Sequence, residues 1–263
     1  MNPDAVVAAA QHLMAQRDAI ALYERLPEAL RPVNLNEGYA VQAEIVRRRE
    51  AQGHRLGGWK IGCTTVQMQK IMGLPGPAHG AVLADSIFKS PAEIGMDRTV
   101  GPLAECEIAM RIASDVPARP GGHDAASIAP HVAACMAAIE LAEARYPDRS
   151  ALTPPELIAD DVFQRGIVLG PEVTAWRAVD LEGATGRTVI AGALRGEGHG
   201  RDVMGNPLLA LAWLADMLAG AGGGLKAGQI VLTGAIVNAA PVSPGETAVC
   251  SVDGLGEARL TIL

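Results

Sequence analysis

The most informative stretch of this sequence is residues 101–112, which read GPLAECEIAMRI. The stretch is rich in apolar residues and begins with Gly and Pro, which predicts a β-strand over Glu105–Ile112. Successive side chains of a strand point to opposite faces, so Glu105 and Glu107 would point the same way. Two carboxylates this close repel each other unless water solvates them or they share a cation, and oxygen ligands suit Mg²⁺ or Mn²⁺ better than zinc. Taken alone, the pattern is more typical of a solvated strand face than of a metal site.

A third acidic side chain, Glu140, lies within the largely apolar residues 133–146, AACMAAIELAEARY. A carboxylate buried in such a run is costly unless it is paired or bound to a metal, so Glu140 is a candidate metal ligand. If the run forms a helix, however, Glu140 could face water beside Glu143. The segment by itself leaves both interpretations open.

Lys60 is a charged residue inside the otherwise apolar residues 57–65, GGWKIGCTT. In a strand it would share a face with Gly62 and Thr64, which are small. A lysine that is buried on such a face has a lowered pKa and can act as a general acid or base. Without further context, an ordinary solvent-facing lysine is the simpler interpretation.

Composition and charge exclude several classes of protein. The chain has 263 residues, with 22 basic and 29 acidic side chains, a net charge of −7, 49% apolar residues and 3% aromatic residues. This hydrophobicity is too high for a disordered chain, and an acidic protein with few aromatics lacks the basic surface and stacking platforms of a nucleic-acid-binding protein. There is no uninterrupted apolar run of about 18 residues, so no membrane span is expected.

The N-terminus and the cysteines point to the cytoplasm. Asp4 lies where a secretory signal peptide needs positive charge, and the apolar run after it is broken at Gln11 and His12. The four cysteines are widely spaced without a C-x-x-C pair, which argues against a disulfide framework and against a zinc site. The sequence therefore predicts a cytoplasmic protein.

The chain divides into two regions that differ in predicted secondary structure. Residues 1–55 read as helical, with one helix around residues 6–14 and a second from the N-cap Asn36 to Gly53. From residue 56 onward the segments are short and β-rich, and strands and helices do not alternate regularly, so a doubly wound sheet and a TIM barrel are disfavoured. Strands are expected at Gly58–Thr64, Ala81–Leu83, Glu105–Ile112, part of Met136–Ala144, Gly166–Leu169, Thr188–Leu194, Gln229–Thr233, Thr247–Val252 and Glu257–Leu263.

Two helices are expected to interrupt the β-rich region. One runs from about Ser127 to Cys135 or beyond, and the other runs from the N-cap Asn206 to Gly220. The glycine-rich residues 196–201, GEGHGR, lack the spacing of a phosphate-binding loop and are interpreted as a flexible loop. The prediction is an α+β fold with a small helical N-terminal region.

Taken together, these segments resemble the 2-keto-4-pentenoate hydratase family, within the fumarylacetoacetate hydrolase superfamily. The resemblance extends over nearly the whole chain, and its motifs occur in the family's order. They are GWKIGCTT, HGAVLADS, LAECEIAMRI, AIELAEAR, IADDVFQRGIVLG, MGNPLLALAWLADML and GLKAGQIVLTGA.

The resemblance implies a fold, a site and a reaction. The fold would be a mixed β-sandwich roll of the fumarylacetoacetate hydrolase C-terminal type over residues 56–263, assembled into a homo-oligomer. Carried over position by position, Glu105, Glu107 and Glu140 would hold one Mg²⁺ or Mn²⁺, and Lys60 and Asp85 would be the acid–base pair. The substrate would lie near Phe163, Thr233 and Gly234.

The implied activity is the addition of water to a 2-hydroxy-2,4-dienoate, giving a 4-hydroxy-2-oxo acid, in the catabolism of aromatic compounds. The same chemistry supports two alternatives, a 4-oxalocrotonate-type decarboxylase and an acylpyruvate-type C–C hydrolase. An alternative of another class is that this chain is a non-catalytic structural partner of such an enzyme. Three positions depart from the family pattern, because Asp161 stands where many members have Asn, Phe163 stands for Ser, and Asn206 stands for His. These departures bear on the substrate more than on the metal site.

Overall fold

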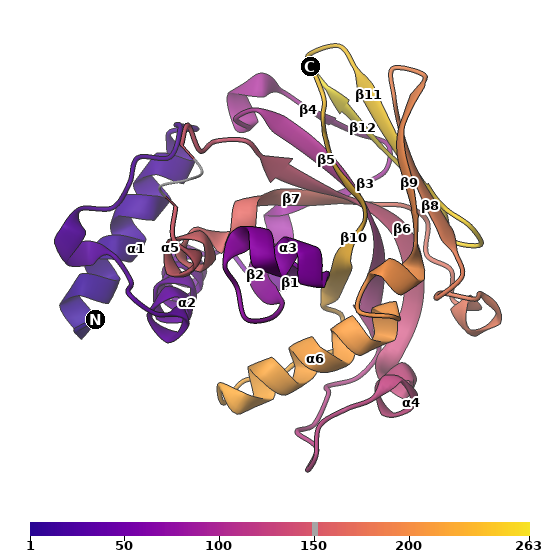
Figure 1. Cartoon of the computed structure of the whole chain (residues 1–263), viewed down its shortest axis with the longest axis horizontal. Coiled ribbons are helices and arrows are strands. Elements are labelled where there is room, and N and C mark those ends of the chain that lie inside the picture. The colour runs from indigo at the N-terminus through magenta and orange to yellow at the C-terminus, as the bar shows by residue number, and fades with distance from the viewer. Residues whose placement is uncertain (149–151) are drawn as a thin grey trace.

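A computed structural model describes residues 1–148 and 152–263 of the chain. Two mixed β-sheets form the body of the molecule, and two long N-terminal helices lie together at one side of it (Figure 1). The helices are α1 (Pro3–Asp18), α2 (Leu35–Ala51), α3 (Val66–Met72), α4 (Ala125–Ile128), α5 (Pro154–Ala159) and α6 (Pro207–Gly220). The strands are β1 (Leu56–Gly62), β2 (Ala78–Leu83), β3 (Ile87–Lys89), β4 (Ala92–Ile94), β5 (Pro102–Ile112), β6 (Val132–Glu143), β7 (Gln164–Leu169), β8 (Thr185–Ile190), β9 (Ala193–His199), β10 (Ile230–Pro241), β11 (Thr247–Val252) and β12 (Gly256–Ile262).

The larger sheet has seven strands in the order β2-β1-β10-β5-β6-β7-β3, and the smaller has five in the order β4-β12-β11-β8-β9. Both sheets are mixed, since β1 pairs with β10, β3 with β7 and β4 with β12 in parallel, while the other pairs are antiparallel. The main hydrophobic core includes inward side chains of both sheets, such as Ile108 and Ile139 from the larger and Cys250 and Leu260 from the smaller. This architecture confirms the expected α+β sandwich roll.

Two N-caps define the helical N-terminal region. The side chains of Asn2 and Asn34 accept hydrogen bonds from the backbone N–H groups of Ala5 and Glu37, which starts α1 and α2. The cap of the second helix is therefore Asn34 and not the expected Asn36, which lies inside the first turn. The two helices share a small core of their own, which also takes in Ala159 of α5.

The predicted helix from Ser127 to Cys135 is wrong. Only α4 and a short 3₁₀ turn precede β6, which starts at Val132 and is paired on both sides, with β5 and with β7. A central strand that is buried on both faces reads as a continuous apolar run without alternation, so its sequence pattern does not distinguish it from a buried helix. Because the segment is a strand, Glu140 points into the protein and not into water.

The flexible loop expected over residues 196–201 is also wrong. Residues up to His199 belong to β9, which forms an antiparallel hairpin with β8. The chain turns between these strands at Ala191 and Gly192, which both have a positive φ, where a single strand over Thr188–Leu194 was expected. In this hairpin the glycines are strand residues, which the sequence pattern did not indicate.

The last long helix, α6, is a core helix. Its N-cap is Asn206, as expected, and its buried face includes Leu211, Leu214 and Leu218. The segment Gly200–Gly220, which includes the turn before the helix, is long and apolar enough by composition to cross a membrane, with a mean hydropathy of 1.3, but half of it is buried inside the protein. We therefore interpret its hydrophobicity as that of a helix that packs on the sheets.

The contact between β1 and β10 gives a test of this architecture. A Cβ atom added at Gly58 would lie 1.9 Å from the carbonyl oxygen of Ile230, its partner in the register. We expect Gly58→Ala to lower the free energy of unfolding by about 1–3 kcal/mol or more, since the two backbones must separate. Urea unfolding measures this change, and Gly76→Ala, where a Cβ meets nothing within 4 Å, is the control. Equal stability of the two variants would contradict the close contact between β1 and β10 at Gly58.

Candidate metal centre

Two neighbouring strands bring three carboxylates together. The antiparallel register of β5 and β6 places Glu105 directly opposite Glu140, and Glu107 lies two residues further along β5 on the same face. One oxygen from each of the three side chains lies within 4.8 Å of the others. Residues that are distant in the sequence thus form one cluster of hard oxygen ligands.

The cluster is buried and only partly satisfied by the protein. Glu107 and Glu140 are no more than 1% exposed, and Glu105 is half-buried. Among the residues that the structure describes, no hydrogen-bond donor contacts Oε1 of Glu107 or Oε2 of Glu140. Burial, followed by the neighbouring charges of Glu140 and Glu105, raises the pKa of Glu107 well above its usual range. A cation between the three side chains would remove this repulsion, so the residues fit a divalent metal ion.

A bulge in β10 supplies a backbone donor to Glu107. The register of β10 against β5 shifts between Leu232 and Ala235, and the N–H of Gly234 donates to Oε2 of Glu107 at 2.8 Å. Gly234 has a φ of +117°, and a Cβ there would lie 2.5 Å from the side chain of Thr64. Only glycine therefore allows the backbone to approach the carboxylate in this way.

Lys60 of β1 completes the site. Its Nζ forms an ion pair with Oε1 of Glu140 at 2.9 Å and donates a hydrogen bond to the carbonyl oxygen of Val162 at 2.7 Å. The side chain is almost fully buried. Burial alone would lower the pKa of Lys60, but the carboxylates of Glu140, Glu105 and Glu107 outweigh it and raise this pKa. The lysine is therefore a charged neighbour of the cluster and not the neutral amine that its apolar segment suggested.

The carbonyl oxygen of Val162, which accepts a hydrogen bond from Lys60, belongs to a strained turn. Asp161, Val162 and Phe163 have φ values of 61°, 52° and 67°, a left-handed conformation that costs energy for residues other than glycine. The turn is held from both sides, because Oδ1 of Asp161 accepts a hydrogen bond from the N–H of Ala81 at 2.7 Å and the preceding Asp160 is enclosed by cations.

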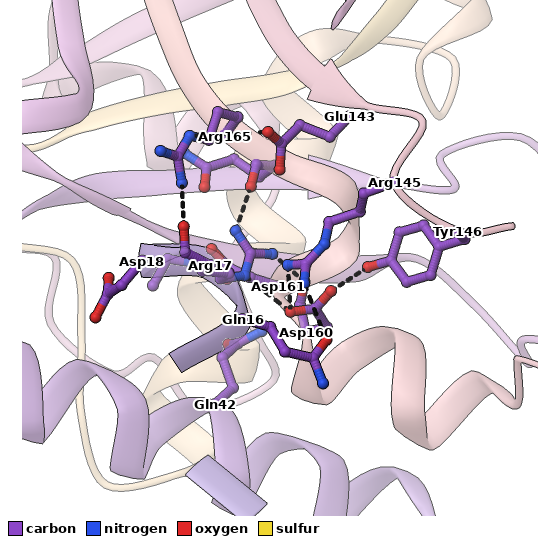
Figure 2. Close-up of polar contacts among 12 residues, drawn as sticks. Gln16, Arg17, Asp18, Gln42, Glu143, Arg145, Tyr146, Asp160, Asp161 and Arg165 are labelled. Carbon is purple, nitrogen blue, oxygen red and sulfur yellow. Dashed lines mark hydrogen bonds and ion pairs between the residues drawn. The ribbon is translucent and has the colours of Figure 1, made fainter. Parts of the chain in front are cut away.

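Figure 2 shows how Asp160 is enclosed. Its carboxylate accepts from Nε of Arg17 at 2.8 Å and from Nη1 of Arg145 at 3.3 Å, and the hydroxyl of Tyr146 donates to its other oxygen. Arg17 also donates to the carbonyl oxygens of Asp160 and Gln164. The helical N-terminal region thus fixes the turn that orients Lys60, because Arg17 belongs to α1.

The acidic cluster opens into a pocket of about 260 Å³. Lys60, Glu105 and Glu140 belong to its lining, and Asn238 is a further polar group. The rest of the wall is mainly small or apolar, with Phe163 packed edge-on against Tyr146 at a ring distance of 4.9 Å. The other lining residues are Gly62, Cys63, Thr64, Thr65, Met68, Met72, Leu103, Ala142, Val162, Ala235 and Ala239.

The structure brings most of the expected site residues together, but not all of them. Phe163 lines the pocket and Gly234 contacts the cluster, whereas the hydroxyl of Thr233 is buried and donates to the carbonyl oxygen of Ile108. Asp85 lies elsewhere, in a 3₁₀ turn after β2, where its half-exposed carboxylate contacts Nδ1 of His54 at 2.5 Å. It lines a different pocket from Lys60.

Sequence reasoning missed two features of the site. Val162 acts through its carbonyl oxygen, which no side-chain pattern can indicate. Asp161 is the buried acid next to this contact, and burial raises its pKa to about 7. Two consecutive acids inside the apolar run IADDVF were a signal for a buried charge, but they were read only as a departure from the family pattern.

A two-sheet roll with three converging carboxylates beside a buried lysine defines an enzyme that uses a divalent cation. The chain belongs to the family described as fumarylacetoacetate (FAA) hydrolase C-terminal, whose model matches residues 63–263. This membership confirms the resemblance seen in the sequence.

Relatives and solved structures agree with this membership. The chain is 32% identical to a 2-keto-4-pentenoate hydratase from Paraburkholderia phymatum, over 97% of this chain and 95% of the relative. It is 30% identical to a 2-oxo-hept-4-ene-1,7-dioate hydratase from Escherichia coli, over 89% and 91%. A 4-oxalocrotonate decarboxylase from Pseudomonas putida G7, complexed with magnesium and adipate, superposes with a TM-score of 0.93 at 25% identity, over 100% of this chain and 99% of that one. A fumarylpyruvate hydrolase from Pseudomonas aeruginosa, with Mn²⁺ and pyruvate, shares the fold with a TM-score of 0.61 at 19% identity, over 78% and 88%.

Replacing one carboxylate tests the metal centre. We expect Glu107→Gln to keep the fold, because the amide oxygen can still accept from Gly234, and to leave the metal-free protein at least as stable, because one repelling charge is gone. Mn²⁺ should stabilise the unchanged protein by about 2.7 kcal/mol at about 100 times its Kd, and should no longer stabilise the variant. Thermal unfolding with and without Mn²⁺ measures both effects. Glu93→Gln, at an exposed position of β4, is the control, and equal Mn²⁺ stabilisation of all three proteins would contradict the site.

Proposed function

We propose that this chain is a divalent-metal-dependent hydratase. Its substrate would be a 2-hydroxy-2,4-dienoate, the enol form of a 2-keto-4-enoate, and its product a 4-hydroxy-2-oxo acid, in the breakdown of aromatic compounds. The observation that carries this proposal is the buried cluster of Glu105, Glu107 and Glu140 beside Lys60, next to a pocket of about 260 Å³. The names of several relatives, all hydratases of 2-oxo acids, support the same reaction.

In this proposal the three glutamates hold one Mg²⁺ or Mn²⁺. When it is bound, the cation supplies Lewis-acid stabilisation for the negative charge that develops on the 2-oxo oxygen of the substrate. Carboxylate ligands suit either ion, and the relatives' structures were solved with magnesium, calcium or manganese.

Lys60 is the proposed acid–base group. Its ammonium group is held by Glu140 and by the carbonyl oxygen of Val162, so its proton is directed at the cluster and not at bulk water. A protonated Lys60 can donate a proton to the substrate carbon chain during ketonisation and can take one back during the addition of water. Asp85 has no part in this proposal, because its carboxylate contacts His54 and lines another pocket.

The composition of the pocket favours a substrate with one carboxylate. Lys60 is the one cation among the described residues that line it, and it is already paired with Glu140. A second carboxylate would find no other cation in this lining, which includes the apolar Met68, Met72 and Phe163. Since an unpaired buried charge is strongly disfavoured, a dicarboxylate should bind poorly there.

The number of carboxylates on the substrate distinguishes the hydratase from a decarboxylase with the same fold. A 4-oxalocrotonate-type decarboxylase would act on a diacid, and the structural similarity to such an enzyme supports it as a second candidate. An acylpyruvate-type C–C hydrolase rests on the shared fold alone. A non-catalytic partner would not need three intact ligands and a paired lysine, so the cluster argues against it. We further propose that the enzyme is cytoplasmic and homo-oligomeric, with no nucleic-acid or membrane partner.

Product analysis tests the reaction. With Mg²⁺ and 2-hydroxypenta-2,4-dienoate, we expect NMR to show 4-hydroxy-2-oxopentanoate with no release of CO₂, and EDTA should abolish turnover. 4-Oxalocrotonate should be used with a kcat/KM lower by about tenfold or more, because its second carboxylate is desolvated without a partner. Full activity in EDTA, or CO₂ as a product, would contradict the proposed hydratase.

Replacing the lysine tests its role. We expect Lys60→Met to lower kcat by about 10²–10⁴-fold, since that is the usual contribution of a general acid–base group. Metal affinity should stay the same or increase, because a cation next to the ligands has been removed. Steady-state kinetics and Mn²⁺ titration measure the two quantities, with the exposed Lys70→Met as the control. Parallel losses of kcat and of metal affinity would mean that Lys60 only supports the structure of the site.

A further inference from the structure

A second pocket, of about 280 Å³, lies where the helical N-terminal region meets the sheets. Helices α1 and α2 contribute Arg17 and Arg49 to its lining, and the strands and turns contribute Arg98, Gln164 and Arg165. Figure 2 shows part of this region, with Arg17 and Arg165 close to each other and to the turn at Asp161. The proposed hydratase reaction makes no use of this pocket.

The second pocket is separate from the metal centre, since the two pockets share no lining residue. In the register of β1 and β2, Lys60 is opposite Gly80, so the next residue, Ala81, points the other way, and Ala81 lines the second pocket. On β6, Glu140 lines the pocket of the metal centre and its neighbour Leu141 lines the second pocket. Successive side chains of the same strand therefore line two different pockets.

Hydrogen-bond donors in this pocket lack acceptors. Gln164 is only 4% exposed, and among the described residues nothing accepts a hydrogen bond from its Nε2. The guanidinium of Arg98 lies 5.5 Å from the ring centre of Phe88 and makes no hydrogen bond or ion pair with the described part of the chain. A buried donor without an acceptor is costly, so Nε2 of Gln164 indicates a missing acceptor. The guanidinium of Arg98 is exposed, so it is free to turn toward a ligand in the pocket.

Arg165 is a third donor in the lining, although its Nη1 already donates to the carbonyl oxygen of Arg17 at 3.5 Å. Its Nε donates to the carbonyl oxygen of Arg98 at 2.7 Å, and its nearest carboxylate, Glu143, is 3.8 Å away. Burial lowers the pKa of Arg165, and the neighbouring guanidinium groups of Arg17, Arg98 and Arg145 lower it further against the opposing effect of Glu143. The surroundings of Arg165 would therefore favour an additional negative charge.

The carboxylates near the pocket do not supply that charge. Asp18 is paired with Arg49, Asp85 with His54 and Asp160 with Arg17. Asp161 accepts a hydrogen bond from the N–H of Ala81, and burial raises its pKa to about 7. Glu143, which lies beside Arg165, accepts from the N–H of Val100. Among the described residues, none of these carboxylates accepts a hydrogen bond from Nε2 of Gln164.

We propose that this pocket binds a small organic carboxylate, which accepts hydrogen bonds from Arg98, Arg165 and Gln164. Arginine suits this role because its planar guanidinium can donate two hydrogen bonds to one carboxylate. The pocket volume is at the lower end for small-molecule sites. The wall also contains Ile45, Phe88 and Leu141, so the ligand has an apolar body, which distinguishes it from inorganic phosphate.

Calorimetry on the full chain tests this proposal, with hexanoate as the probe. EDTA in the buffer removes divalent cations, so a carboxylate has no metal ion to bind at the acidic cluster. We expect hexanoate to bind with one site per chain, and Arg98→Gln and Arg165→Gln each to weaken binding by about tenfold or more, the usual effect of losing a charge-assisted hydrogen bond. Hexanamide, which has the same body without the charge, should not bind measurably.

Two controls keep the outcome interpretable. The side chain of Arg98 is exposed and makes no hydrogen bond with the described residues, so Arg98→Gln should keep the thermal stability of the unchanged protein. Arg195→Gln, at an exposed position of β9, should bind hexanoate normally. The proposal is overturned if hexanoate gives no saturable binding, or if Arg98→Gln and Arg165→Gln both bind it as the unchanged protein does. Phosphate that binds as tightly as hexanoate would overturn the organic class of the ligand. None of these results depends on the activity of the metal centre.

Discussion

The mutual repulsion of three buried carboxylates is the constraint on which the rest of this site depends. Glu105, Glu107 and Glu140 lie within a few ångströms of one another on adjacent strands, where Lys60 pairs with Glu140 and the N–H of Gly234 donates to Glu107. Burying like charges is unfavourable unless a counter-charge is present. The antiparallel pairing of β5 with β6 holds these side chains in place despite their repulsion. A divalent cation bound between the carboxylates would make the arrangement favourable.

A strained backbone turn lies beside this cluster, and contacts to the preceding Asp160 hold it in place. The left-handed turn at Asp161–Phe163 presents the carbonyl oxygen of Val162 to Lys60, and the enclosed Asp160 holds the turn in place. Arg17, which makes several of these contacts, comes from the first helix of the chain. The helical N-terminal region is therefore more than a cover for the sheets, because it supports the lysine of the site through the turn and forms one wall of a second pocket.

Local patterns predicted those elements whose physical signal is itself local. The caps and apolar face of α6 and the alternation in β5 were readable, since each depends on neighbours within a few residues. β6 was misread in part as a helix, because a strand that is buried on both faces loses its alternation. The family resemblance indicated the three ligands and Lys60 together, whereas the E-x-E pattern alone favoured a solvated face. The position of Asp85 in another pocket could not be read from its motif, because that position depends on the short turn after β2.

The order of residues alone determined the strand alternation that puts Glu105 and Glu107 on one face, the acidic and aromatic-poor composition, and the two ends of α6. The pairing of β5 with β6 placed Glu140 opposite Glu105, and the bulge at Gly234 aimed an N–H at the cluster. These features belong to the three-dimensional structure, because register and strand order are set by the packing of the whole sheet and not by any one segment. The charge state of Lys60 belongs there too, since it is set by carboxylates that lie far from it along the chain.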